Sequence, residues 1–116
     1  MAISKFEDLI AWQKAQDTAV LIYKTFRDNQ DFGFKNQICR ASVSISNNIA
    51  EGFGRKGRKE FVQFLHIALG SSSEVKSMVY LALRLDHIDK PQKELLLDIV
   101  DETNRLIYGL IKSIRQ

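Results

Sequence analysis

The longest uninterrupted helical repeat in this chain constrains its fold more than any other feature. Between Arg58 and Leu85, apolar and small side chains recur every three or four positions, and no proline interrupts them. This spacing places them on one face of an α-helix. Because such a face is buried only against other elements, the repeat predicts a long helix packed within a bundle. The face consists of Phe61, Phe64, Leu65, Ala68, Ser72, Val75, Val79, Ala82 and Leu85.

Three other segments carry the same periodicity, at about residues 6–27, 34–52 and 91–114. Ser4 and Glu7 fit a capping box at the start of the first segment. Pro91 is well placed in the first turn of the last segment. Together with a helix at about 58–85, these segments predict an all-α four-helix bundle that forms one domain, residues 1–116.

The second segment also carries a weaker, strand-like signal. Ala41 to Ser46 reads A-S-V-S-I-S, an alternation with β-branched residues. A longer helical stripe runs from Ile38 to Gly52, and we favour the helix because the longer pattern carries more information. We expect Gly52 to end this helix in the left-handed conformation that glycine adopts without steric cost.

The third and fourth segments each raise a question about packing. Gly70 lies within a helical repeat, where glycine costs about 1 kcal/mol relative to alanine. A close helix crossing or a kink would explain it. The fourth segment carries two adjoining apolar stripes, one from Leu95 to Ile114 and one from Leu96 to Ile111. One stripe suffices for packing in a bundle. The additional apolar surface indicates either contact with a second copy of the chain or a broad buried face in a thick bundle.

Composition narrows the class of protein. The chain has 116 residues, of which 45% are hydrophobic and 27% charged, as in globular proteins. Its single cysteine, Cys39, cannot form an intrachain disulfide and points weakly to a reducing compartment. The N-terminal stretch lacks the apolar core of a secretory signal. There is no apolar run of about 18 residues. We therefore expect a cytoplasmic protein with no membrane segment.

No catalytic constellation is evident in the sequence. Gly52 to Gly57 matches G-x-G-x-x-G, but that fingerprint requires a preceding strand, whereas a helical pattern precedes it here. His66 and His87 have no second histidine one helical turn away, and Cys39 has no histidine near it in sequence. We expect no enzyme activity, metal or cofactor. An enzyme that uses Cys39 or His66 would need these side chains to be adjacent in space.

The sharpest functional feature is a basic loop. The net charge is +3, and the excess lies in residues 1–60, which carry 10 Lys and Arg against 7 Asp and Glu. Four cations within five positions between two helices are able to neutralise phosphates with little sequence selectivity. Alternatively, the loop is a solvated turn. The candidate nucleic-acid-binding residues are Arg55, Lys56, Arg58 and Lys59, extended by Lys35 and Arg40 if these face the same way.

Several sequence blocks together resemble a known family. They are F-E-D-L-I-x-W-Q-K-A at Phe6–Ala15, Q-I-C-R-A-S at Gln37–Ser42, N-I-A-E-G-F-G-R at Asn48–Arg55, and E-F-V-Q-F-L-H-I-A-L-G-S at Glu60–Ser71, followed by Glu74. The chain is similar over nearly its whole length to the bacterial 23S rRNA intervening-sequence proteins, also called the S23 family. The most specific part of this match is the N-I-A-E-G block at Asn48–Gly52 followed by the A-L-G-S-x-x-E block at Ala68–Glu74.

The resemblance implies several expectations. It implies an antiparallel up-down bundle, homopentameric rings and an association with RNA. A related group serves as accessory proteins of retroelement reverse transcriptases and binds RNA and protein. Asn48, Glu51 and Glu74 match family positions, and we expect them to join the second and third helices structurally rather than catalytically.

Two functional hypotheses follow. The first is a non-enzymatic, homo-oligomeric RNA-binding protein whose copies pool the charge of the basic loop. The second is a scaffold that contacts a protein partner through the apolar faces of the first and fourth helices, with no direct role for nucleic acid.

Overall fold

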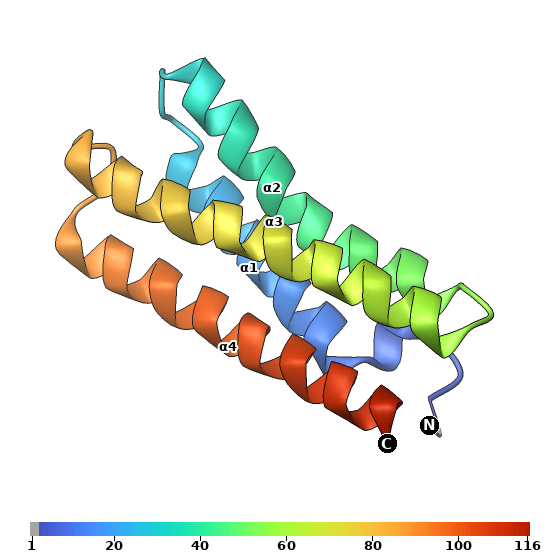
Figure 1. Ribbon diagram of the computed structural model, residues 1–116. Helices are drawn as coiled ribbons and strands as arrows, with labels where there is room; N and C mark the ends of the chain where they lie inside the picture. The colour runs from blue at the N-terminus through green and yellow to red at the C-terminus, as the bar shows by residue number, and fades with distance from the viewer. Residues whose placement is uncertain (1–2) are drawn as a thin grey trace.

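The computed structural model describes residues 3–116 as a bundle of four α-helices, with no strand in that range. They are α1 (Ile10–Phe26), α2 (Phe32–Phe53), α3 (Arg58–Arg84) and α4 (Lys90–Arg115), and a short 3-10 helix, η1 (Phe6–Asp8), precedes them. The prediction of an all-α four-helix fold is confirmed. Consecutive helices run antiparallel, and α4 packs on α1 as well as on α3 (Figure 1). The start of the described residues and the C-terminus therefore lie at the end of the bundle that carries the α2–α3 loop.

The first helix begins later than its periodicity indicates. The backbone is extended at Leu9, with φ −72° and ψ 121°, so α1 starts at Ile10 rather than Phe6. The predicted capping box of Ser4 and Glu7 is wrong, because η1 has Lys5 at its N-cap and no side chain caps it. The break turns the Leu9 side chain into the core, where it is buried. Apolar burial outweighs local helix continuity here.

The second helix runs through the segment with the strand-like alternation. The serines that produce the alternation bond within α2: Ser42 Oγ donates to the Cys39 carbonyl (2.8 Å), and Ser46 Oγ donates to that of Val43 (3.3 Å). Such bonds to the preceding turn let serine sit inside a helix. The helix starts at Phe32, before the predicted position, because the Asp31 carboxylate caps it by accepting a bond from the Phe34 amide (3.2 Å).

Gly52 has a different role from the one predicted. It lies inside α2, which continues to Phe53, and the glycines of residues 3–116 all lack a positive φ. The expectation of a left-handed cap is therefore wrong. A Cβ at Gly52 would lie 2.6 Å from the Cβ of Phe64, so α2 and α3 approach each other closely at this point. Gly70, where a close crossing was considered, has no atom within 4 Å of such a Cβ, and α3 passes through it uninterrupted.

The two apolar stripes of α4 have separate environments. Leu96, Val100 and Ile107 of the inner stripe are fully buried. In the outer stripe Leu106 is half-buried and Leu95 is 57% exposed. A single copy of the chain therefore covers one stripe and leaves part of the other in contact with water. No helix in residues 3–116 is long and apolar enough to cross a membrane.

A layer of hydroxyl groups interrupts the apolar core. Thr18 of α1, Ser42 and Ser46 of α2, Ser72 of α3 and Thr103 of α4 are all fully buried. The hydroxyl oxygens of Thr18 and Thr103 lie 3.0 Å apart across the α1–α4 contact. Each helix thus contributes a small polar side chain to the interior, and most of these hydroxyls bond to a carbonyl of their own helix.

Candidate nucleic-acid interface

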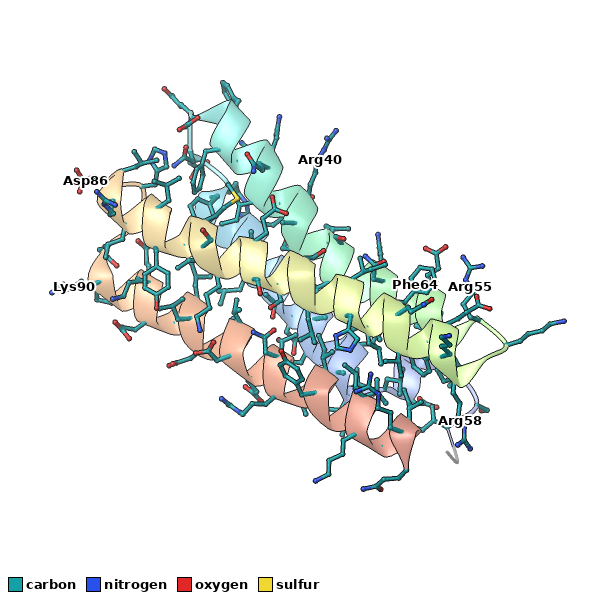
Figure 2. All side chains as sticks on the ribbon, viewed as in Figure 1. Arg40, Arg55, Arg58, Phe64, Asp86 and Lys90 are labelled. Carbon is teal, nitrogen blue, oxygen red and sulfur yellow. The ribbon has the colours of Figure 1, made fainter. Side chains whose placement is uncertain are left out.

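The four cations of the predicted basic loop lie together at one end of the bundle. Arg55 and Lys56 belong to the loop after α2, and Arg58 and Lys59 form the first turn of α3. All four are exposed, and Figure 2 shows Arg55 and Arg58 extending from this end. Within residues 3–116, Lys56, Arg58 and Lys59 make no ion pair. Their charges are available to a ligand.

Arg55 is the exception, because an acid of the same chain contacts it. Its guanidinium lies 3.1 Å from the carboxylate of Glu51, one helical turn back, and 4.9 Å from the centre of the Phe64 ring. These contacts hold the side chain against the junction of α2 and α3. An exposed pair of this kind contributes at most about 1 kcal/mol, so a phosphate is able to compete with Glu51 for the guanidinium.

A groove beside the loop adds one cation, Arg115, that the loop sequence does not contain. It has a volume of about 450 Å³ and lies between the start of α3 and the end of α4. Arg58, Lys59 and Arg115 supply its charge, while Val62 and Ile114 give it an apolar floor. Sequence reasoning missed Arg115. Two signals could have found it: α4 carries basic residues in its last turn, and antiparallel packing places that turn beside the start of α3.

The first turn of α3 contributes backbone amides to the same region. Gly57 is the N-cap residue, and no side chain accepts a hydrogen bond from the first amides of the helix. Unpaired amides and the helix dipole make a helix N-terminus favourable for anions. Glu60, in the same turn, partly opposes this effect. The side-chain cations therefore supply most of the attraction.

The structure does not bring Lys35 and Arg40 to the basic loop. Arg40 lies within α2, about 20 Å before the end of the helix at Phe53, at a rise of about 1.5 Å per residue. Figure 2 shows Arg40 well separated along α2 from Arg55, which follows the end of that helix. Lys35 is farther still, and its ammonium donates to the carbonyl of Arg27 (3.1 Å). These two residues line a separate pocket between α1 and α2.

The expected polar link between α2 and α3 forms in part. The amide of Asn48 donates to the carbonyl and to the hydroxyl of Ser44 (2.8 and 2.9 Å), and the Ser44 hydroxyl lies 2.9 Å from that of Ser71 on α3. Farther along, Glu74 accepts a bond from the amide of Gln37 (3.2 Å). Glu74 thus bonds directly to α2, whereas Asn48 bonds within α2 and reaches α3 only through Ser44. Glu51 instead pairs with Arg55.

The side chains considered for catalysis lie in different places. Cys39 lines the α1–α2 pocket, whereas His66 lines the groove beside the basic loop. Burial raises the pKa of the Cys39 thiol, and the nearby Lys35 offsets this only partly, so the nucleophilic thiolate is disfavoured. Residues 3–116 contain no group of three His, Cys, Asp or Glu side chains arranged to hold a metal ion.

Comparison with known proteins places the chain in a family. It is similar to a crystal structure of a protein of unknown function from the S23 ribosomal protein family of Bacteroides thetaiotaomicron. The TM-score is 0.82 and the sequence identity 30%, over 89% of this chain and 99% of that one. No curated protein matches the chain. A family model described as 23S rRNA-intervening sequence protein matches residues 7–109. The chain therefore belongs to the family of 23S rRNA-intervening sequence proteins.

Proposed function

We propose that this chain is a non-enzymatic, cytoplasmic RNA-binding protein that contacts phosphates through its basic end. The basic end is defined as Arg55, Lys56, Arg58, Lys59 and Arg115. The proposal rests on the position of these five cations around one loop and groove. Of the five, Arg55 is the one that pairs with an acid within residues 3–116. The family's description, with its reference to 23S rRNA, favours RNA over other polyanions.

Cations of this kind bind through release of the counterions that surround RNA. Such binding is strong at low salt, weakens steeply as salt rises and discriminates poorly between sequences. The side chains of the basic end are exposed, and contacts of such cations with phosphates carry no sequence information directly. The proposal is therefore for recognition of the RNA backbone.

Association of several copies would strengthen this weak site. The α1–α4 face of a single chain leaves Ile10 64% and Leu95 57% exposed. A hollow of about 290 Å³ at the same face is lined by Ile10, Leu106 and Leu110. We propose that copies of the chain pack through this face into a homo-oligomer, a pentamer by the family resemblance. Several basic ends on one RNA raise the overall affinity without new contacts.

Charge reversal at the basic end tests the proposal. The Lys56→Glu/Lys59→Glu variant should bind a fluorescently labelled structured RNA at least about tenfold more weakly than the parent at ~0.1 M salt, measured by anisotropy. The matched control is Lys24→Glu/Lys90→Glu, which changes the net charge equally at exposed positions elsewhere. An equal loss in the two variants, or no loss in the first, would refute a localised RNA site.

The alternative function is a protein-interaction scaffold, and the exposed apolar side chains of α1 and α4 favour it. In that case the α1–α4 face contacts a foreign protein and the basic end is incidental. Affinity purification from the native host would then recover a stoichiometric protein that nuclease treatment does not release. It would also recover that protein with the Lys56→Glu/Lys59→Glu variant.

A further inference from the structure

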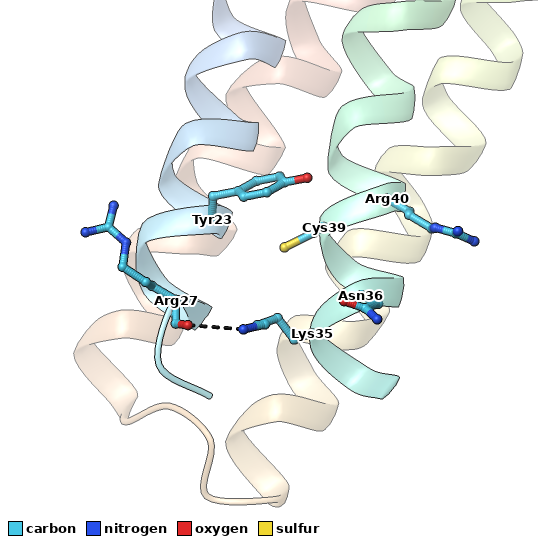
Figure 3. Close-up of a pocket in the computed structure, with 6 residues that line it drawn as sticks. All are labelled: Tyr23, Arg27, Lys35, Asn36, Cys39 and Arg40. Atoms are coloured by element: carbon cyan, nitrogen blue, oxygen red, sulfur yellow. Dashed lines mark hydrogen bonds between the residues drawn. The ribbon is translucent and has the colours of Figure 1, made fainter. Parts of the chain in front are cut away.

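A second basic site lies at the other end of α2. The last turns of α1 and the first turns of α2 enclose a pocket of about 550 Å³. Figure 3 shows the ring of Tyr23 reaching across from α1 above the thiol of Cys39 on α2. The lining residues are Tyr23, Arg27, Lys35, Asn36, Cys39 and Arg40.

The pocket has an unbalanced charge. Three of its lining side chains, Arg27, Lys35 and Arg40, are cationic, and none is acidic. Within residues 3–116 these cations make no ion pair. The carboxylate of Asp31, on the neighbouring link, is occupied by His87 (3.0 Å) and by the amide of Phe34. Mutual repulsion among such cations is relieved when an anion binds between them.

Lys35 is fixed so that it faces this pocket. Its ammonium donates to the carbonyl of Arg27 at the end of α1 (3.1 Å) and lies 5.3 Å from the centre of the Phe32 ring. Both partners are neutral, so the ammonium keeps its full charge and two further protons to donate. A cation beside the last carbonyls of α1 also interacts favourably with the helix dipole.

The remaining polar side chains lie at the edges of the pocket. In Figure 3 the guanidinium groups of Arg27 and Arg40 extend outward from the two sides of the pocket, while the amide of Asn36 lies between Lys35 and Arg40. Exposed side chains change rotamer within nanoseconds, so both guanidinium groups are able to close on a ligand held by Lys35. The fork of an arginine matches two oxygens of a phosphate.

We propose that the α1–α2 pocket binds a phosphate group, held by Lys35 and clamped by Arg27 and Arg40. The phosphate is carried either by a small phosphorylated molecule, such as a free nucleotide, or by RNA. The site is separate from the basic end, because about 20 Å of α2 lies between Arg40 and the loop that carries Arg55. It does not depend on the RNA-binding function proposed above, because a small phosphate ligand alone suffices to occupy it.

Two-dimensional amide NMR of the full chain tests the proposal with three probes: sodium pyrophosphate, adenosine monophosphate, and a short RNA with and without a 5′-phosphate. At least one probe should produce saturable shifts centred on Tyr23, Lys35 and Cys39. If pyrophosphate and the nucleotide do so, the ligand is a small phosphate ester. If only RNA shifts these residues, the ligand is a phosphate of RNA. If RNA without a 5′-phosphate then fails to shift them, the pocket binds the 5′-terminal phosphate.

Two variants make the test specific. Arg40→Gln removes an exposed side chain whose loss leaves the core intact. It should raise the dissociation constant of the ligand at the pocket about tenfold, as expected for the loss of one charged hydrogen bond. Lys56→Gln/Lys59→Gln should leave it unchanged. The proposal would be overturned if no probe shifted the pocket residues at concentrations up to about 10 mM, where even a binding free energy of only a few kcal/mol would be detected. Shifts that persist unaltered in Arg40→Gln would also overturn it.

Discussion

At Gly52 the absence of a side chain allows α2 and α3 to approach. An added Cβ would lie 2.6 Å from the Cβ of Phe64 and 3.3 Å from the carbonyl oxygen of Phe61. Both neighbours are fixed close to the backbone of α3. We therefore expect Gly52→Ala to lower the free energy of unfolding by about 1–3 kcal/mol, the usual range for overpacking. Urea denaturation followed by circular dichroism measures this change.

Gly70→Ala is the matched control, since it makes the same chemical change in the interior of α3. Apart from the neighbouring backbone of α3 itself, no atom lies within 4 Å of the added Cβ, and the position is exposed. Alanine should raise the free energy of unfolding by about 1 kcal/mol through its higher helix propensity. If both substitutions stabilise the protein, the close approach at Gly52 does not exist. If Gly70→Ala destabilises it, Gly70 lies at a contact with another copy of the chain.

The hydroxyl layer in the core leads to a second prediction at this scale. Thr18 and Thr103 each bond to a carbonyl of their own helix, at 3.0 and 2.8 Å, so removing one hydroxyl leaves the other satisfied. Thr103→Val should therefore change the free energy of unfolding by less than about 1 kcal/mol. By comparison, Ile107→Ala at a fully buried position should cost about 2–5 kcal/mol. A loss above about 2 kcal/mol in Thr103→Val would show that the layer acts cooperatively.

At the scale of the elements, Asp31 joins two links of the bundle. Its carboxylate caps α2 and bonds to His87, which follows α3. The hydrogen bond from His87, with a further contribution from the Phe34 amide, lowers the pKa of Asp31 below its usual 3.8. A lowered pKa stabilises the fold above the pKa of the unfolded chain, and this stability is lost as the pH falls through the lowered value.

Asp31→Asn isolates this effect, because asparagine is also a good N-cap. We expect the variant to melt at a lower temperature than the parent at about pH 5, and we expect this difference to shrink between about pH 4 and pH 2, as the pH falls through the lowered pKa of the parent's carboxylate. Scanning calorimetry over this pH range measures the difference. A gap of constant size across this range would exclude Asp31 as the titrating group.

The number and type of helices could be predicted from sequence because apolar periodicity records which face of each helix is buried. The break at Leu9 could not, because it depends on which core site that leucine fills. The function of Gly52 was also out of reach, since it depends on where Phe64 lies. Both features arise from contacts between elements that are distant in the sequence.

The candidate site also combines residues whose grouping is visible in the sequence with a residue that only the packing of distant helices brings in. Arg55, Lys56, Arg58 and Lys59 are contiguous, so their clustering is visible in the sequence. Arg115 joins them only through the antiparallel packing of α4 on α3. The separation of Arg40 from the loop, by contrast, was available from helix geometry, because the helical stretch from Arg40 to Phe53 spans about 20 Å.

At the scale of the whole molecule, the uncovered α1–α4 face predicts self-association. Light scattering should give a mass several times that of one chain, falling toward one chain in an Ile10→Glu/Leu95→Glu variant. Both side chains are more than half exposed, so each chain of the variant should keep its fold, and the helix content measured by circular dichroism should be unchanged. A parent protein that scatters as one chain would contradict the assembly, and so would a variant of unchanged mass.

The dependence of RNA affinity on salt tests the basic end most directly. The logarithm of the association constant for a single-stranded RNA should fall linearly with the logarithm of the salt concentration. Removing two phosphate contacts in Lys56→Gln/Lys59→Gln should make the slope shallower by about 1.4, or about 0.7 per cation. The Lys24→Gln/Lys90→Gln control should keep the parent's slope. Identical slopes for all three proteins would contradict the account, because the basic end would then neutralise no RNA phosphate.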